Sequence, residues 1–178
     1  MQKNKINIAK KTLSELEKLS WKNVSLNKIL KSEKNIKFTK KEDLLININR
    51  YFDYLLKENL INIENSSLKD MLFEVYMARL DILNLHRKSI LNIIKYFYLQ
   101  PKLLITLIPS LVESMIVIAT LSNIDVNGIK GIAKIKVLFF LYLLIFFTWR
   151  NDDSDSLEKT MTVLDKYLSN IEKIFKFF

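Results

Sequence analysis

The chain has 178 residues, of which 49% are apolar, and it contains 2 Gly, 2 Pro and no Cys. The missing cysteines exclude disulfides, thiolate zinc sites and thiol catalysis, and the scarcity of helix breakers predicts long helices in one domain, or in one domain with a small appendage. The formal charge is +9, and residues 1–60 carry 14 Lys and Arg against 7 Asp and Glu, which favours an anionic partner unless the lysine-rich composition alone accounts for it.

The first third of the chain predicts three helices. Apolar side chains recur at helical spacing over residues 7–19. Ser25 is the expected N-cap of a short helix over 26–30. Thr39 with Glu42 is typical of a capping box, at the start of a helix that extends to about Leu56.

The rest of the chain predicts further helices and no strand. Ser66 or Ser67 opens a helix whose apolar stripe continues to about Leu99, and Pro101 begins the next helix, which ends near Ser122. A helix is expected over 129–149, and a last amphipathic helix follows the aspartates and continues to the end of the chain. The predicted fold class is therefore all-α.

Two apolar runs raise the question of a membrane span. Residues 103–121 contain one charge, Glu113, and residues 137–149 contain none. The second run has about 13 apolar residues where a span needs roughly 20, and Glu113 would lie in mid-span. We therefore favour buried helices of a soluble bundle over a hairpin in a bilayer. The N-terminus also lacks the apolar region of a secretory signal.

The acid cluster of Asp152, Asp153 and Asp155 has two interpretations. Paired aspartates can hold Mg²⁺ on a diphosphate, but such a site needs a second acidic cluster, and none is visible in the sequence. Asp155 with Glu158 three residues later matches an N-cap with its reciprocal partner, at the positive end of a helix dipole. We favour the cap, and we expect no metal and no cofactor.

Nothing in the sequence favours catalysis. The single histidine, His86, has no second histidine or Glu-x-x-His pair for a metal site, and Gly128 and Gly131 flank one short loop without forming a phosphate-binding motif. We expect His86 to be a packed or surface residue and the protein not to be an enzyme.

Three segments together resemble alphaproteobacterial TetR-like proteins. Residues 20–30 and 38–45 look like the two ends of a TetR helix-turn-helix. Residues 70–91 resemble the start of the ligand domain, through Leu72, Phe73, Met77, Arg79, Asp81, His86 and Arg87. Residues 148–172 are similar to a further pattern of that group, through Trp149, Asp152, Asp153, Ser154, Asp155, Thr160, Met161, Leu164 and Asp165.

That group overlaps the lipid-binding accessory family of ubiquinone biosynthesis. The resemblance implies a TetR-like helical bundle, with a degenerate helix-turn-helix-like region at 1–46 and a ligand-binding and dimerisation domain at 47–178. It also implies a homodimer, an apolar lipid or quinone-like ligand, and a cytoplasmic protein in peripheral contact with the inner membrane. The expected function is a non-enzymatic lipid- or isoprenoid-binding protein, an accessory factor in ubiquinone biosynthesis. The alternative is a TetR-family transcriptional regulator that binds DNA as a dimer.

The DNA-binding region departs from the family pattern. Eight residues lie between Ile29 and Phe38, about six too few for the turn and the recognition helix that a major-groove reader needs. Sequence-specific DNA binding is therefore not expected. The lysines of this region can still contact phosphates without sequence specificity, and they are Lys31, Lys34, Lys37, Lys40 and Lys41.

Two further sites are expected in the larger domain. An apolar cavity between helices 103–121 and 132–149 has as candidate lining Met115, Ile118, Phe139, Tyr142, Phe146 and Trp149, with ordinary core packing as the alternative. A C-terminal tip is expected to dock on anionic membrane through Lys173, Phe175, Lys176, Phe177 and Phe178. The alternative for the last helix is a dimer seam over 157–171, where apolar residues alternate by four and three.

Overall fold

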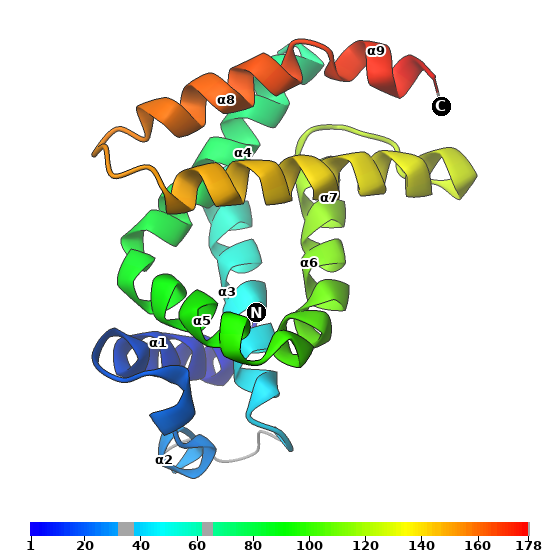
Figure 1. The fold of residues 1–178 in the computed structure, drawn as a ribbon. Coiled ribbons are helices and arrows are strands. Elements are labelled where there is room, and N and C mark those ends of the chain that lie inside the picture. Colours follow the sequence, from blue (N-terminus) through cyan, green and yellow to red (C-terminus); the bar gives the residue numbers. More distant parts are fainter. Residues whose placement is uncertain (32–37, 62–65, 178) are drawn as a thin grey trace. The chain divides into compact units, whose positions relative to one another are not determined.

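The computed structural model describes residues 1–31, 38–61 and 66–177, and these residues form helices and no strand (Figure 1). The all-α fold class is thereby confirmed, and the TetR-like arrangement stays a prediction. The longer helices are α1 (Lys3–Lys18), α3 (Glu42–Asn59), α4 (Leu68–Leu85), α5 (Arg87–Leu99), α6 (Pro101–Leu121), α7 (Gly128–Arg150) and α8 (Glu158–Leu168). The shorter ones are the 3₁₀ turn η1 (Trp21–Asn23), α2 (Leu26–Leu30) and α9 (Ile171–Lys176).

The chain divides into two compact units, each built from two segments. Unit 1 comprises Met1–Leu55 and Ile82–Leu111, and unit 2 comprises Leu56–Asp81 and Val112–Phe178. The sequence-based expectation had placed a single boundary after residue 46.

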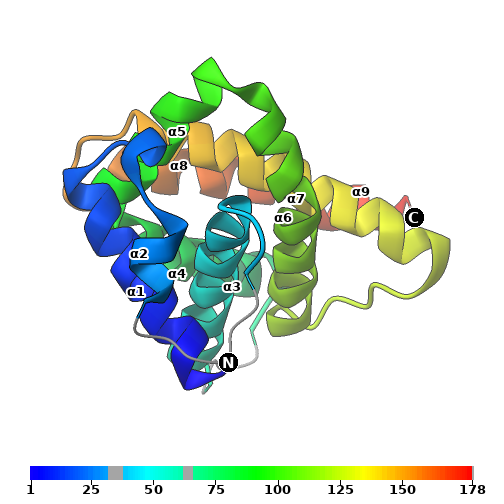
Figure 2. The ribbon, with the colours of Figure 1, turned by 90° about the horizontal axis from the view of Figure 1, so that it is seen from below.

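Unit 1 is organised around the packing of α1 against α5 (Figure 2). The buried face of α1 includes Leu13 and Leu16, spaced to lie on one side of the helix. Two polar side chains of α5 bind α1 carbonyls: Ser89 Oγ donates to Leu13 O at 2.8 Å, and Asn92 Nδ2 donates to Leu16 O at 2.7 Å. The second bond satisfies a carbonyl that the helix end leaves without a partner of its own.

In unit 2, α7 and α8 lie side by side, and buried polar side chains of α4 form hydrogen bonds in the same core. The inner face of α7 buries Leu138, Leu141 and Ile145. The Tyr76 hydroxyl of α4 donates to Leu138 O at 2.7 Å, so a fully buried phenol is satisfied by a helix carbonyl.

Two of the predicted helix caps are confirmed. The Ser25 side chain accepts from the Lys28 amide at the start of α2, and Ser67 Oγ accepts from the Asp70 amide at the start of α4. The predicted pair of Thr39 and Glu42 was wrong in detail, because α3 begins only at Glu42. Asp43 Oδ2 instead accepts from the Thr39 amide at 2.8 Å.

Two helices predicted as continuous are broken. The stripe from residue 68 to 99 is interrupted at His86, whose φ of −116° and ψ of 23° leave the helical region and whose amide bonds to Leu83 O. The last predicted helix is interrupted at Ser169 and Asn170, which separate α8 from α9. In both places the apolar period continues through the break, so the hydrophobic pattern alone does not reveal it.

Candidate functional site

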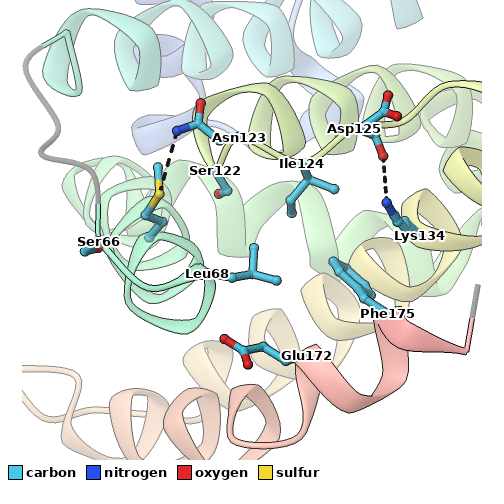
Figure 3. A pocket seen from close by; sticks show the side chains of 10 residues that line it. Ser66, Leu68, Ser122, Asn123, Ile124, Asp125, Lys134, Glu172 and Phe175 are labelled. Carbon is cyan, nitrogen blue, oxygen red and sulfur yellow. Dashed lines mark hydrogen bonds between the residues drawn. The ribbon is translucent and has the colours of Figure 1, made fainter.

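A cavity of about 590 Å³ lies in unit 2, at the end of α6 (Figure 3). This volume falls within the range of small-molecule sites, roughly 300 to 1,000 Å³. Its lining comes from the start of α4, the loop between α6 and α7, the first half of α7, and α9. The residues are Ser66, Leu68, Met71, Ser122, Asn123, Ile124, Asp125, Lys134, Glu172 and Phe175.

The cavity has an apolar side and a polar side. Leu68, Ile124 and Phe175 point toward one another in Figure 3, and Met71 is a further apolar residue of the lining. The polar side is tied together by hydrogen bonds: Lys134 Nζ donates to Asp125 O at 3.1 Å, and the Asp125 carboxylate accepts from the amide and the side chain of Asn127. The lining is therefore amphipathic.

The polar side is formed by the way α6 ends. Asn123 adopts a left-handed conformation with φ of 54°, and the Ile124 amide then bonds back to Ala119 O at 2.9 Å. This is the geometry of a Schellman C-cap, which turns the chain sharply out of the helix. It holds Ser122 at the cavity, where its side chain is 1% exposed and its Oγ has no hydrogen-bond partner among the described residues.

The six side chains predicted to line an apolar cavity are buried or half-buried in the structure. Met115, Ile118, Tyr142 and Trp149 are buried, and Phe139 and Phe146 are half-buried. The Phe146 ring lies 5.9 Å from the Tyr142 ring and 5.4 Å from the Trp149 ring. None of the six lines the cavity at the end of α6. The ligand pocket predicted for them stays a prediction.

A fully buried arginine belongs to this aromatic cluster. Arg79 of α4 is 0% exposed, its Nη2 donates to Ser114 Oγ at 3.2 Å, and its guanidinium carbon lies 5.4 Å from the centre of the Tyr142 ring. A guanidinium over an aromatic face is an attractive arrangement, stronger where water is excluded. Arg79 therefore ties α4 to α6 and α7 inside unit 2, a structural role that the sequence pattern did not specify.

The acid cluster is a helix-capping device, but the predicted capping residue was wrong. Asp152, 1% exposed, accepts at Oδ2 from the Thr160 amide and hydroxyl, each at 2.8 Å. Its Oδ1 accepts from Ser154, and Ser154 Oγ in turn accepts from the Glu158 amide at 3.0 Å. Asp155 is exposed, and the residue before α8 is Leu157, in a left-handed conformation. The first and third amides of α8 are thus capped from Ser154 and Asp152.

Hydrogen bonding determines the charge state of Asp152. Burial raises the pKa of this carboxyl, but the hydrogen bonds from the hydroxyls and amides of Ser154 and Thr160 outweigh it and lower the pKa to about 2. The carboxylate is therefore ionised at neutral pH. Among the described residues, no group of three or more His, Asp or Glu side chains is arranged to hold a metal ion.

The outer face of α7 is apolar and exposed. Phe140 is 64% exposed and Phe147 is 52% exposed. With Leu144 and the earlier isoleucines they form a stripe on one side of the helix, which we call the outer stripe: Ile129, Ile132, Phe140, Leu144 and Phe147. By length and composition alone, helices α6 and α7 are both long and apolar enough to cross a membrane. In the most apolar part of each helix, 39% of the residues of α6 and 28% of those of α7 are buried.

The predicted membrane tip is divided by the structure. Phe175 lines the cavity and is half-buried, whereas Phe177 is 87% exposed and Lys173 is exposed. Phe178 and the side chain of Lys176 lie outside the described residues.

Most of the apolar side chains of the predicted dimer seam are covered within the single chain. Leu157, Leu164, Leu168 and Ile171 are all buried within this single chain, and Met161 is 38% exposed. These side chains therefore belong to the core of the single chain, and a seam between two copies over residues 157–171 stays a prediction.

The predicted anionic contacts are also divided. Lys31 and Lys40 are exposed, and Lys34 and Lys37 lie outside the described residues. Lys41 is engaged by unit 1 itself: its Nζ donates to Trp21 O and Lys22 O and lies 4.8 Å from the centre of the Trp21 ring. Burial lowers the pKa of Lys41, against the opposing effect of Glu42. The Lys41 ammonium group therefore has a structural role in unit 1, and its contact with phosphate stays a prediction.

His86 is half-buried and packed, which is one of the two placements expected from the sequence. Its ring stacks on Phe52 with the centroids 5.7 Å apart. Burial lowers its pKa, against the opposing effect of Glu17, so the imidazole is neutral at pH 7.

These features define an all-α protein with an amphipathic cavity and an exposed apolar helix face in unit 2. No protein-family model matches the chain. No curated protein matches it either.

Proposed function

We propose that this protein is a non-enzymatic lipid-binding protein that docks on anionic membrane through α7. The observation that carries the proposal is the outer stripe, five large apolar side chains of which four are more than half exposed: Ile129, Ile132, Phe140 and Phe147. A helix that is apolar on all sides is normally covered on all sides. In this chain α8 packs on α7, and the outer stripe is left exposed.

The charges of α7 favour a lipid surface as the partner. Between Gly128 and Arg150 the helix carries no acidic residue. It carries four cationic residues, Lys130, Lys134, Lys136 and Arg150. Lys130 and Lys136 are exposed, as the outer stripe is. An apolar stripe with only cations beside it is the pattern of a helix that lies in the interface of an anionic membrane.

Peripheral docking fits the neighbours of α7 better than a membrane span does. Helix α8 packs beside α7, and its outer side carries exposed Lys159, Asp165 and Lys166. Charged groups of this kind are costly in a hydrocarbon core. With the outer stripe in the lipid interface, α8 stays on the aqueous side.

The ligand class remains the one that the family resemblance implies, an apolar lipid or an isoprenoid quinone. Native mass spectrometry of protein isolated from a membrane fraction tests it. We expect a bound phospholipid or prenylated quinone, removed by delipidation and restored by incubation with lipid extract. Protein that is free of lipid after gentle isolation, and that also fails to bind vesicles of phosphatidylglycerol, would contradict the proposal.

A further inference from the structure

The cavity at the end of α6 is a candidate binding site that has no part in the proposed membrane docking. The outer stripe contributes none of its lining, and neither do the six residues of the predicted apolar pocket. All of its lining residues lie in unit 2, so the cavity does not depend on the placement of unit 1.

Ser122 provides the first indication of a ligand. Its hydroxyl is buried and has no hydrogen-bond partner among the described residues. Most buried hydroxyls in folded proteins are satisfied, so an unsatisfied one at the wall of a cavity calls for a partner from within that cavity. A ligand atom that donates or accepts a hydrogen bond would supply it.

The electrostatics of the cavity favour a donor over an acceptor. The carbonyl end of α6 forms one wall, and the C-terminus of a helix dipole favours positive charge. Two carboxylates, Asp125 and Glu172, border the cavity against one cation, Lys134, which already donates to Asp125 O. An anionic head group would therefore meet net negative charge.

The opposite wall fits a short apolar tail. The residues that line it are Leu68, Met71, Ile124 and Phe175. The sulfur of Met71 lies 3.9 Å from the side-chain nitrogen Nδ2 of Asn123 (Figure 3). A methionine and a phenylalanine together form an adaptable apolar surface. Phe175 comes from α9, so this helix supplies part of the wall.

We propose that this cavity binds a small amphiphile whose polar head donates hydrogen bonds to Ser122, with a primary ammonium preferred because Glu172 faces the same space. The tail lies against the apolar wall. The site is distinct from the membrane-docking face of α7.

A series of probes with one tail and three heads tests the proposal: octylamine, octanol and octanoate, each added to the intact protein below its micelle concentration. We expect amide resonances of residues 122–125 to shift on titration. Octylamine should bind at least tenfold more tightly than octanoate, with octanol between them. Equal binding of octanoate and octylamine, or shifts that avoid residues 122–125, would overturn the proposal.

Two variants separate the roles of the polar groups. Ser122→Ala should lower the affinity for octylamine and for octanol alike, by about three- to tenfold. Glu172→Gln should lower the affinity for octylamine by a similar factor. The affinity for octanol should stay unchanged, since a neutral head group gains nothing from the carboxylate. Glu74→Gln, an exposed position on α4 outside the cavity, is the matched control and should change none of the three. An unchanged octylamine affinity in both site variants, with native spectra, would contradict the assignment.

Discussion

Asp152, on the loop after α7, accepts two hydrogen bonds from Thr160 in the first turn of α8, from the amide and from the hydroxyl, each at 2.8 Å. The carboxylate thereby caps the helix from outside it, eight residues upstream. The negative charge also lies at the positive end of the α8 dipole.

Asp152→Asn should destabilise the protein. The amide cannot accept at all the positions that the carboxylate uses, and bonds to a charged acceptor are worth more than neutral ones, so we expect a loss of about 2 kcal/mol in the free energy of unfolding. Asp155→Asn is the control, because Asp155 is exposed and does not cap α8, and it should change the value by less than about 0.5 kcal/mol. Urea unfolding of both variants measures the difference. A larger loss for Asp155→Asn would contradict the assignment of the cap.

The low pKa of Asp152 predicts an acid-sensitive contribution to stability. The folded pKa of about 2 lies below the model value of 3.8, so the folded state favours the ionised form. The stabilisation is fully present above the unfolded pKa and is lost as pH falls through the folded one. The difference in unfolding free energy between the native protein and Asp152→Asn should therefore shrink as the pH is lowered from about 4 to about 2. Urea unfolding across that range measures it, and a constant difference would disprove the pKa shift.

His86 gives a clean test of the packing at the junction of α4 and α5. Burial lowers its pKa below the model value of 6.5. Protonation is thus easier in the unfolded chain, so this group costs stability as pH falls below 6.5 and costs nothing above it. Because the chain has 1 His, its imidazole proton resonance is assigned without ambiguity. An NMR titration should give a midpoint below 6.5, and a midpoint at or above that value would contradict the burial of the ring.

Lys41 and Lys40 should differ although they are neighbours. Lys41→Met removes two hydrogen bonds to carbonyls and the contact with Trp21, and we expect it to cost about 1 kcal/mol of unfolding free energy. Lys40 is exposed, and Lys40→Met should stay within about 0.5 kcal/mol of the native protein. Thermal or urea unfolding compares them. Equal stability of the two variants would show that the Trp21 contact contributes nothing.

Local signals predicted much of the fold. Ser25 and Ser67 begin their helices as their N-capping chemistry requires, and Pro101 begins α6. The breaks at His86 and at Ser169 were missed, because the apolar period continues in phase through both of them. Asp155 was chosen as a cap by its spacing to Glu158, but the true cap closes over a longer loop.

The candidate site was predictable only in part. The lining of the cavity comes from segments as far apart as Leu68 and Phe175, and no local pattern connects them. The outer stripe does have a sequence signature, because Ile129, Ile132, Phe140 and Phe147 recur at helical spacing on the side opposite Leu138 and Leu141. A helix with apolar residues on both faces predicts a second partner.

The proposed function depends on the binding of lipid by the outer stripe. Flotation with vesicles of phosphatidylglycerol and phosphatidylcholine, comparing the native chain, the double variant Phe140→Ser/Phe147→Ser and the control Leu99→Ser, tests it most directly; Leu99 is 76% exposed and lies outside α7. Loss of two large apolar groups from the interface should lower partitioning at least tenfold, a change of about 1.4 kcal/mol, while the control floats like the native chain. Flotation of the double variant at the native level would contradict lipid binding by the outer stripe.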